Sequence, residues 1–574
     1  MLASGLDNLI HVFILGSLLL LLFVKLSYYR NTLANANCKT PVTVHSLVPF
    51  IGPVLSMMAR PELFLRQLLL ILHDTPIQIL LPGSRLYLAS PGDQIAWMLK
   101  GSRHLVPTPS LLYAFQTFFG LHKVDSKVFE HANISAFEAD LPFSTNHPDP
   151  SRRIMEHQRR DFMKYLQGQG LKVMLIRFIK NLTNETLQQT AISNDWIQIP
   201  DLYTFMVTKV FRSEVEALYG RHIFTTCPRL HEDFWSFYDA FPRISLGLPR
   251  WLSRSSYQTQ DRILKSLRQW RISCQETRSL NDHALQSTEY DPVWGSQYIR
   301  KMLGRYFDLG FTEDGVDTAM LGFLFVTFAN TIPATAWMML YVLLDKRITE
   351  RVKEELSTID LMGSGFTNTG DLASRPLLNS IYCETLRLRV ASAVGRKSTI
   401  KIRTPGGWEF EANNPIMFPS WLSGLDDSFW NTGRTLSEGG PQHPVDTFWA
   451  ERFLQYPDDP LSGPARTESL GHQPSVEKEV PKSANDDRRA KLVTKGVQGH
   501  WFPFGGGVSK CPGEALARQT ILISVAFMFH NFEIRLSSPD EARKAGSKHR
   551  ALPFGSHAFD RPVPITIRRR RFLP

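Results

Sequence analysis

The sequence predicts a mainly α-helical protein with a minor β component, preceded by one transmembrane helix at its N-terminus. Three observations predict this fold class. Apolar residues recur at helical spacing from about residue 150 to 345, residues 78–90 read as two short strands around a Pro-Gly turn, and residues 9–24 are almost continuously apolar. With 43% hydrophobic and 11% aromatic residues among 574, the chain can bury one large core.

The predicted anchor is the segment LIHVFILGSLLLLLFV, residues 9–24. It is short against the roughly 20 residues that span a bilayer, but the apolar stretch reaches Tyr29 if the Lys25 side chain extends toward the headgroups. Basic residues follow the segment and only Asp7 precedes it, which predicts a cytosolic position for the remaining chain. A cleaved signal peptide is the alternative, but the segment that resembles a cleavage site, residues 34–36, lies well beyond the apolar run.

We therefore expect a membrane anchor at residues 1–30, a proline-containing hinge at residues 31–55 and one large domain at residues 56–574. Within that domain, residues 456–497 form a polar insert with few aromatic residues. We expect this insert to be a loop or a disordered segment.

The composition argues against several classes of function. Lysine and arginine number 65 against 54 for aspartate and glutamate, a net charge of +11, and no dense basic tract suggests a nucleic-acid partner. The five cysteines are scattered and form no CxxC pair, so neither a disulfide framework nor a zinc site is expected. This cysteine usage favours a reducing compartment.

A long helix is expected from Thr312 to Lys346. Thr312 is a candidate N-cap, and the acidic residues that follow it favour the first turn of a helix. Apolar residues then surround nearly the whole circumference, which predicts a helix buried through the middle of the domain; a membrane span is the alternative, which the acidic start argues against. Pro333 removes a backbone donor, so we expect a kink or groove beside Asn330 and Thr331 where a small ligand binds.

The segment FPFGGGVSKCPGE, residues 502–514, raises the question whether Cys511 is a buried core residue or a presented thiolate. Its glycines allow the backbone to approach a flat partner closely and expose N–H groups toward the sulfur. The residues that follow read as a helix whose positive N-terminal end lies next to Cys511. A phosphate-binding loop is the alternative, but GGGVSK lacks the GxxxxGKS/T spacing, and Lys510 occupies the third glycine position of GxGxxG.

Three motifs, in this order along the chain, resemble those of the cytochrome P450 superfamily. ETLR (384–387) supplies an ExxR pair, Glu384 and Arg387, and AERF (450–453) supplies a later arginine, Arg452. The loop then fits FxxGxxxCxG with Phe504, Gly507, Cys511 and Gly513. The resemblance implies the cytochrome P450 fold, in which a long central helix lies over heme b and the β-sheets are small. It also implies that the Cys511 thiolate is the axial ligand of the heme iron, and that Glu384, Arg387 and Arg452 form a buried ion-pair network.

Within the superfamily, FANTIPATAW (328–337) resembles the sterol 7α-hydroxylase and prostacyclin synthase branch, in a fungal style. The family usually carries an acid–alcohol pair on the central helix that relays protons. Here Ile332 and Pro333 occupy those positions, and neither side chain can donate or accept a proton. Asn330, Thr331 or water would have to substitute, so Asn330 and Thr331 are our candidate catalytic residues.

A second departure concerns the heme propionates. The family commonly has arginine or histidine two residues before the cysteine, where this sequence has Ser509. Arg396 is therefore the best candidate for pairing with a propionate. The third departure is the polar insert at residues 456–497, which other members of the family have in a shorter form.

The resemblance implies a monooxygenase that hydroxylates a lipophilic small molecule, such as a terpenoid, a sterol or another secondary metabolite. Residues 105–121 and 237–252 would wall its pocket. Because the chain contains no flavin or nicotinamide domain, electrons would come from NADPH-cytochrome P450 reductase in the endoplasmic reticulum membrane, with cytochrome b5 as a further donor, docking near Lys510 and Arg518. The alternatives are a heme-thiolate isomerase or dehydratase that rearranges a peroxide without O₂ or reductase, and a heme-binding or membrane scaffold without catalysis.

Overall fold

The structure is a computed structural model. It describes residues 39–44, 52–59, 64, 67–68, 70–71, 74–81, 83–101, 105–106, 108–129, 149, 153–188, 192–359, 369–434, 441–466, 487–507, 510–548 and 555–571. The predicted membrane anchor at residues 1–30 and Ser509 lie outside the described residues. The membrane anchor therefore stays a prediction.

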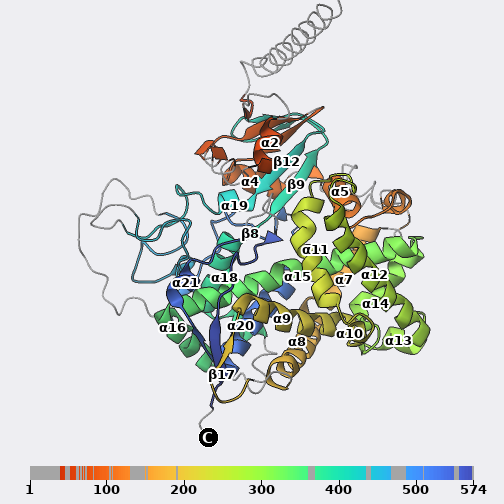
Figure 1. Cartoon of the computed structure of the whole chain (residues 1–574). Helices are drawn as coiled ribbons and strands as arrows, with labels where there is room; N and C mark the ends of the chain where they lie inside the picture. Colours follow the sequence, from red (N-terminus) through yellow and green to blue (C-terminus); the bar gives the residue numbers. More distant parts are fainter. Residues whose placement is uncertain are drawn as a thin grey trace, which may run out of the picture.

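Helices form most of the molecule, as the sequence predicts, and one long helix runs through their middle (Figure 1). The larger helices are α5 (Thr108–Phe118), α7 (Ile154–Tyr165), α8 (Gly168–Thr183), α9 (Leu202–Tyr219), α11 (Leu230–Ile244), α12 (Arg254–Thr277), α14 (Gln297–Asp308), α15 (Glu313–Leu344), α16 (Lys346–Ser357), α18 (Pro376–Arg389) and α20 (Glu514–Asn531). Shorter ones are α2 (Gly52–Ala59), α4 (Asp93–Gly101), α10 (His222–Thr226), α13 (His283–Ser287), α17 (Thr369–Ala373), α19 (Ser420–Ser423), α21 (Pro539–Arg543) and the π-helix η2 (Asn184–Gln188).

The main sheet lies at one end of the helical body, together with α2 and α4 (Figure 1). Its strand order is β1 (Val42–Thr43), β2 (Ile77–Leu81), β3 (Ser84–Leu88), β12 (Pro415–Pro419), β9 (Ala393–Ser398) and β4 (Leu105–Val106). β2 and β3 are the two strands predicted around the Pro-Gly turn, and they pair antiparallel with Ile79 opposite Leu86. β9 pairs antiparallel with β12, and this register fixes the position of Arg396 opposite Ile416.

The remaining strands form small sheets. One joins β15 (Phe532–Leu536), β17 (Ile565–Arg569) and β5 (Ile197–Ile199), and four two-stranded sheets pair β8 (Val390–Ala391) with β16 (Gly555–Ser556), β13 (Leu454–Gln455) with β14 (Lys491–Leu492), β10 (Ile402–Arg403) with β11 (Glu409–Phe410), and β6 (Tyr290–Asp291) with β7 (Gly295–Ser296). The β13–β14 pair shows that the end of the predicted polar insert near Lys491 is ordered in the structure, while residues 467–486 lie outside the described residues.

Helix α15 is the predicted central helix. Its N-cap prediction is confirmed, because the Thr312 hydroxyl accepts a hydrogen bond from the Gly315 N–H at 3.1 Å. The helix runs without a break through Pro333, and it packs against α9, α12, α18 and α20. Among described helices it alone is long and apolar enough to cross a membrane, but most of its surface is buried inside the protein. We therefore assign it to the core.

Two side chains interrupt the burial of α15. Val326 is 54% exposed and Asn330 is half-buried, although their neighbours along the helix are buried. Residues four apart lie on one face of a helix. This face, which we call the open strip of α15, therefore borders a space that solvent can enter, in the middle of a helix whose other central residues are buried.

Candidate functional site

The three charged residues predicted to form a network do so. The Arg387 Nε lies 2.7 Å from Glu384 Oε2, and the Arg452 Nε lies 3.0 Å from Glu384 Oε1. All three side chains are fully buried. Burial alone would raise the pKa of Glu384, but the guanidinium groups of Arg387 and Arg452 outweigh it and hold that pKa below its ordinary value. Glu384 is therefore a carboxylate in the core.

The network joins α18 to the segment that leads toward Cys511. Arg387 also donates to the carbonyl oxygen of Val445 at 2.7 Å, and Arg452 donates to the carbonyl oxygen of Asn431. The Trp501 indole N–H donates to the carbonyl oxygen of Cys383 on α18 at 3.2 Å, just before the glycine-rich loop. The network and this bond together fix the loop relative to the helical core.

The Cys511 loop is a tight turn held by its own backbone. The Cys511 N–H donates to the carbonyl oxygen of Phe504 at 2.9 Å, and the Lys510 N–H donates to that of Gly507 at 3.2 Å. Gly507 has a φ of +64°, and a side chain there would place its first carbon 1.8 Å from the carbonyl oxygen of Leu99 on α4. Only glycine fits this approach. The helix predicted after Cys511 is confirmed as α20, which begins at Glu514, directly after Gly513.

Cys511 differs from the other described cysteines in its exposure. Cys227, Cys274 and Cys383 are buried, whereas Cys511 is exposed. Although part of Cys511 reaches the surface, the protein atoms packed around its thiol remove water and raise the pKa of the thiol. The hydrogen bond from the Gly513 N–H lowers this pKa by less than burial raises it. A bound cation at the sulfur would have to displace the proton, as metal binding to cysteine generally does.

Arg396 supplies a second feature that fits a heme. Arg396 is 9% exposed, and its guanidinium donates a hydrogen bond to the carbonyl oxygen of the adjacent Gly395. No acidic side chain within the described part of the chain forms an ion pair with it. Burial lowers the pKa of Arg396 to about 10. A buried cation without an anionic partner is costly, and a propionate would supply that partner. An exposed cysteine sulfur, a glycine cradle and this arginine together match the donor set that a heme requires.

The two candidate catalytic residues on α15, Asn330 and Thr331, have different environments in the structure. Asn330 reaches the open strip, where its Oδ1 accepts a hydrogen bond from the Ser556 N–H at 3.1 Å. Thr331 is buried, and its hydroxyl donates to the carbonyl oxygen of Thr327 at 2.9 Å. Ile332 and Pro333 are also buried. Asn330 is thus the polar side chain that this part of α15 presents to the open strip.

The two stretches predicted to wall the pocket lie together against α15. The Phe241 ring on α11 stacks on the Phe325 ring of α15 with 4.2 Å between centroids, and it meets Phe118 of α5 edge-on at 5.1 Å. Phe119 approaches the same Phe325 ring at 5.8 Å. A side chain at Gly322 would reach the ring of Phe115 at 3.1 Å, so α5 lies close to α15. These contacts form a packed group of aromatic rings, which we call the aromatic wall, and it includes Phe325, the residue directly before Val326.

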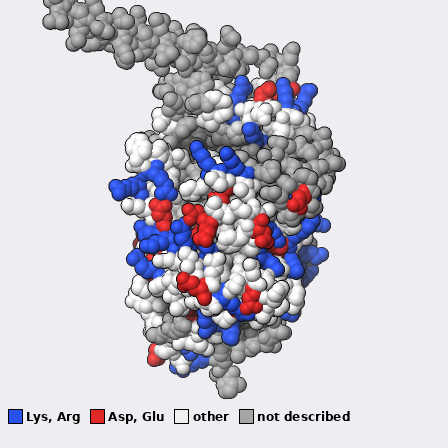
Figure 2. Space-filling view, turned by 90° about the vertical axis from the view of Figure 1, so that its right-hand side faces the viewer, with Lys and Arg blue, Asp and Glu red and all other residues white. Residues whose placement is uncertain are grey.

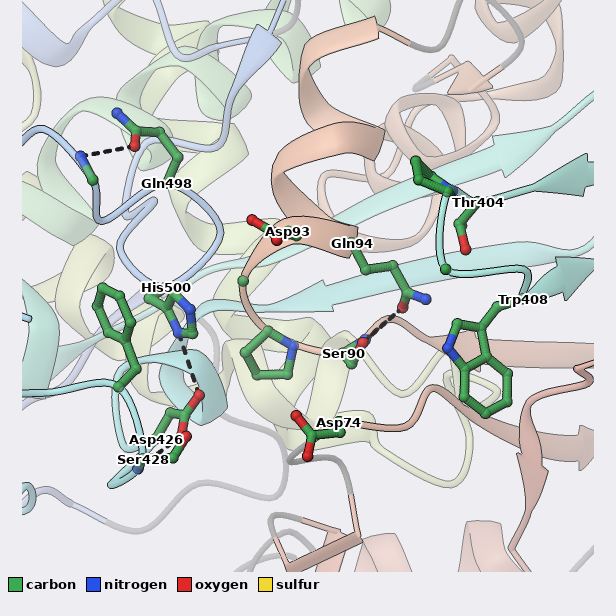
Figure 3. A pocket seen from close by; sticks show the side chains of 16 residues that line it. Asp74, Ser90, Asp93, Gln94, Thr404, Trp408, Asp426, Ser428, Gln498 and His500 are labelled. Atoms are coloured by element: carbon green, nitrogen blue, oxygen red, sulfur yellow. Dashed lines mark hydrogen bonds and ion pairs between the residues drawn. The ribbon is translucent and has the colours of Figure 1, made fainter. Parts of the chain in front are cut away.

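A polar pocket away from α15 was not anticipated from the sequence (Figure 3). It has a volume of about 600 Å³ and lies between α4, residues 404–408, residues 426–429 and residues 496–500. The Nδ1 atom of His500 lies 3.3 Å from an oxygen of the Asp426 carboxylate, and the His500 ring stacks on Phe429 with 3.6 Å between centroids. Its lining comes from several distant segments without a shared motif, so no local pattern could have found it.

The two basic side chains expected to lie near a docked redox partner, Lys510 and Arg518, both have hydrogen-bond or ion-pair partners within the chain. Lys510 forms an ion pair with Glu514 at 2.5 Å, and Arg518 donates from Nε to the side-chain oxygen of Asn379 at 3.0 Å. Arg518 is therefore held against α18 by a neutral amide, which does not cancel its positive charge, and docking of a redox partner near Lys510 and Arg518 stays a prediction. On the face that carries α12 and α14, basic and acidic side chains are interspersed (Figure 2).

Comparison with known proteins agrees with these features. The sequence model of the family described as Cytochrome P450 matches residues 219–434, which include α15 and α18. The cytochrome P450 monooxygenase fsoE of Humicola fuscoatra is 28% identical over 556 residues, covering 93% of this chain and 88% of that protein. The cytochrome P450 monooxygenase efuG of Hormonema carpetanum is 28% identical over 588 aligned positions, covering 98% of each chain. A 25-hydroxycholesterol 7-alpha-hydroxylase of Rattus norvegicus is 27% identical over 244 residues, covering 40% of this chain and 55% of that protein.

Proposed function

We propose that this chain, which belongs to the cytochrome P450 superfamily, is a heme-thiolate monooxygenase that hydroxylates a lipophilic small molecule of the terpenoid or sterol class. The observation that carries the proposal is the aromatic wall of α5, α11 and α15 beside the open strip. Aromatic and aliphatic side chains of this kind beside a binding site favour a ligand with a large apolar surface. The sterol substrate in the name of the rat relative supports the same class.

Each part of the site would have a separate task. Cys511 would hold the heme iron through its sulfur, and Arg396 would pair with a propionate. When bound, a thiolate-ligated heme supplies the activation of O₂ for attack on a C–H bond. The aromatic wall would orient the substrate and exclude water, while Asn330 would provide a hydrogen bond at the open strip.

The choice of substrate class is tested by reconstitution. Full-length protein with NADPH-cytochrome P450 reductase is expected to consume NADPH and O₂ when given terpenoids or sterols, and to yield a product heavier by one oxygen atom. Compact hydrophilic substrates of similar mass serve as the control. Product formation from the hydrophilic set alone would overturn the proposed substrate class.

A heme-thiolate isomerase or dehydratase is the second candidate, and one observation favours it. Ile332 and Pro333, at the positions of the usual acid–alcohol pair, are apolar and buried, so α15 offers no ionisable group there. Turnover of a lipid peroxide without reductase or O₂, together with no NADPH-dependent product, would support the isomerase and contradict hydroxylation.

We also propose that the protein works at the endoplasmic reticulum membrane, anchored by residues 1–30 and reduced by a separate membrane-bound reductase, with cytochrome b5 as an additional donor. The apolar run at residues 9–24 supports the anchor. Removal of residues 1–30 is expected to release the protein from sedimented membranes at high salt. Retention of the truncated protein in the membrane fraction would show that another surface anchors it.

A further inference from the structure

The Asn330 side chain has a defined orientation. Its partner, the Ser556 N–H, is a donor, so the atom that faces Ser556 must be the amide oxygen. The Nδ2 group consequently points elsewhere, and no described residue accepts a hydrogen bond from it. Because Asn330 is half-buried and lies on the open strip, two N–H donors are available there for a ligand.

The segment that orients Asn330 is itself held from three sides. The carbonyl oxygen of Ser556 accepts a hydrogen bond from the Tyr238 hydroxyl of α11 at 2.6 Å. Strand β16 pairs with β8, placing Ser556 opposite Val390. One residue further, the carbonyl oxygen of His557 accepts from the Trp337 indole N–H of α15 at 2.8 Å. Residues 555–557 therefore connect α11, α15 and β8.

Gly555 provides the space for the Asn330 amide. It has a φ of +68°, and a side chain at this position would place its first carbon 2.4 Å from Asn330 Oδ1. A non-bonded carbon and oxygen cannot lie that close together, so the amide would have to move away. The glycine is thus required for the observed position of Asn330, and not only for the backbone conformation.

We propose that Gly555 and Ser556 are positioning residues that fix the Asn330 amide as a hydrogen-bond donor toward a ligand at the open strip. The inference rests on the proposed function and adds a chemical requirement to it. A side-chain amide donates hydrogen bonds but does not ionise, so Asn330 would orient an acceptor oxygen instead of relaying a proton through its own titration. In an apolar surrounding such a bond is stronger than in water.

The test uses carbon monoxide bound to the reduced, heme-loaded full-length protein, with the C–O stretching frequency measured by infrared spectroscopy. A donor near the ligand oxygen lowers this frequency. Asn330→Leu removes the donor, Asn330→Asp keeps an acceptor for Ser556 but removes the donor, and Gly555→Ala displaces the amide without changing Asn330. All three are expected to shift the stretch to higher frequency.

Gly310→Ala serves as the control. It places alanine at a comparable φ of +85° in open space, away from Asn330. This variant is expected to leave the C–O stretch unchanged. If Gly555→Ala does not fold, Tyr238→Phe loosens the same segment without added volume, and a smaller shift in the same direction is expected.

The outcomes separate this inference from the proposed function. An unchanged C–O stretch in folded, heme-loaded Gly555→Ala would overturn the positioning role. A shift in Gly555→Ala no larger than that of Gly310→Ala would overturn it as well. If Gly555→Ala does not fold, an unchanged stretch in Tyr238→Phe would have the same meaning. In those cases a normal thiolate-type spectrum of the unaltered protein would leave the heme-thiolate assignment intact. Absence of that spectrum in the unaltered protein would instead contradict the assignment itself.

Discussion

Glu384 accepts hydrogen bonds from two arginines that come from different segments of the chain, and all three side chains are buried. Replacing one member of a buried ion pair leaves its partners as uncompensated charges, which costs about 3–5 kcal/mol. Glu384→Gln is therefore expected to lower the free energy of unfolding by about 3–5 kcal/mol. Denaturant titration followed by circular dichroism and by heme absorbance would measure this loss.

An exposed ion pair gives the matched control for Glu384. Glu350 lies 3.0 Å from Lys353 and its side chain is 60% exposed. Because water and salt screen such a pair, Glu350→Gln is expected to change stability very little. Equal losses in the two variants would show that the buried network adds nothing beyond an ordinary surface contact.

The buried carboxyl group of Glu214 on α9 is expected to make the stability of the protein depend on pH. Burial raises the pKa of Glu214 from 4.5 to about 8, and the nearby Thr520 hydroxyl only partly offsets this effect. Between these two values the unfolded chain releases the proton while the folded chain retains it. Raising the pH from about 4.5 to about 8 therefore lowers stability, by at most about 1.4 kcal/mol per pH unit.

Glu214→Gln removes this titration and keeps the shape of the side chain. The variant is expected to gain melting temperature relative to the unaltered protein as the pH rises from about 5 to about 8, the window in which the raised pKa acts. Paired thermal melts at the two pH values measure this gain. A difference between the proteins that does not vary with pH would mean that Glu214 is not protonated in the folded state.

At the scale of single residues, the sequence predicted those roles that depend on short local spacing. Glu384 and Arg387 are one helical turn apart, so their pairing follows from the helix, and the structure adds Arg452 as predicted. The bond between Asn330 and Ser556 joins residues 226 positions apart. No periodicity or motif reports such a contact, because it depends on how the completed fold brings β16 to α15.

At the scale of elements, the Cys511 loop depends on one close approach. The first side-chain carbon of any residue at position 507 would lie 1.8 Å from the carbonyl oxygen of Leu99, a backbone atom that cannot move without moving α4. Gly507→Ala is therefore expected to abolish or strongly reduce heme incorporation. The ratio of heme absorbance to protein absorbance in purified samples measures this effect.

Gly496→Ala is the control for Gly507→Ala. Gly496 has a φ of +84° and open space around its α-carbon, so it carries a similar backbone strain without the close contact. We expect Gly496→Ala to retain heme. Similar heme loss in both variants would attribute the effect to the backbone conformation and not to the approach of α4.

The helix α15 illustrates which properties of an element a sequence can predict. The cap at Thr312 and the burial of nearly the whole helix follow from local chemistry and composition, and both are observed. The open strip at Val326 and Asn330 does not follow from them, because Val326 is as apolar as its buried neighbours. The exposure of Val326 depends on how the surrounding helices pack against α15 in the completed fold.

At the scale of the whole molecule, the site is assembled from segments that are far apart in the chain. Strand β9 carries Arg396, α15 carries Asn330, β16 carries Ser556 and the loop before α20 carries Cys511. The sequence could predict the cofactor because its ligand lies within one contiguous motif. It could not predict the assembled walls or the bracing of Asn330, because these require the packing of α5, α11 and β16 against one helix.

The central claim is that the Cys511 sulfur is the axial ligand of a heme iron. The most direct measurement is the absorbance spectrum of the reduced full-length protein with carbon monoxide. We expect the red-shifted Soret band of a thiolate-ligated heme in the unaltered protein and in Cys227→Ala, which alters a buried cysteine. Cys511→Ala and Cys511→His are expected to lose the band. Its persistence in either Cys511 variant would contradict the assignment.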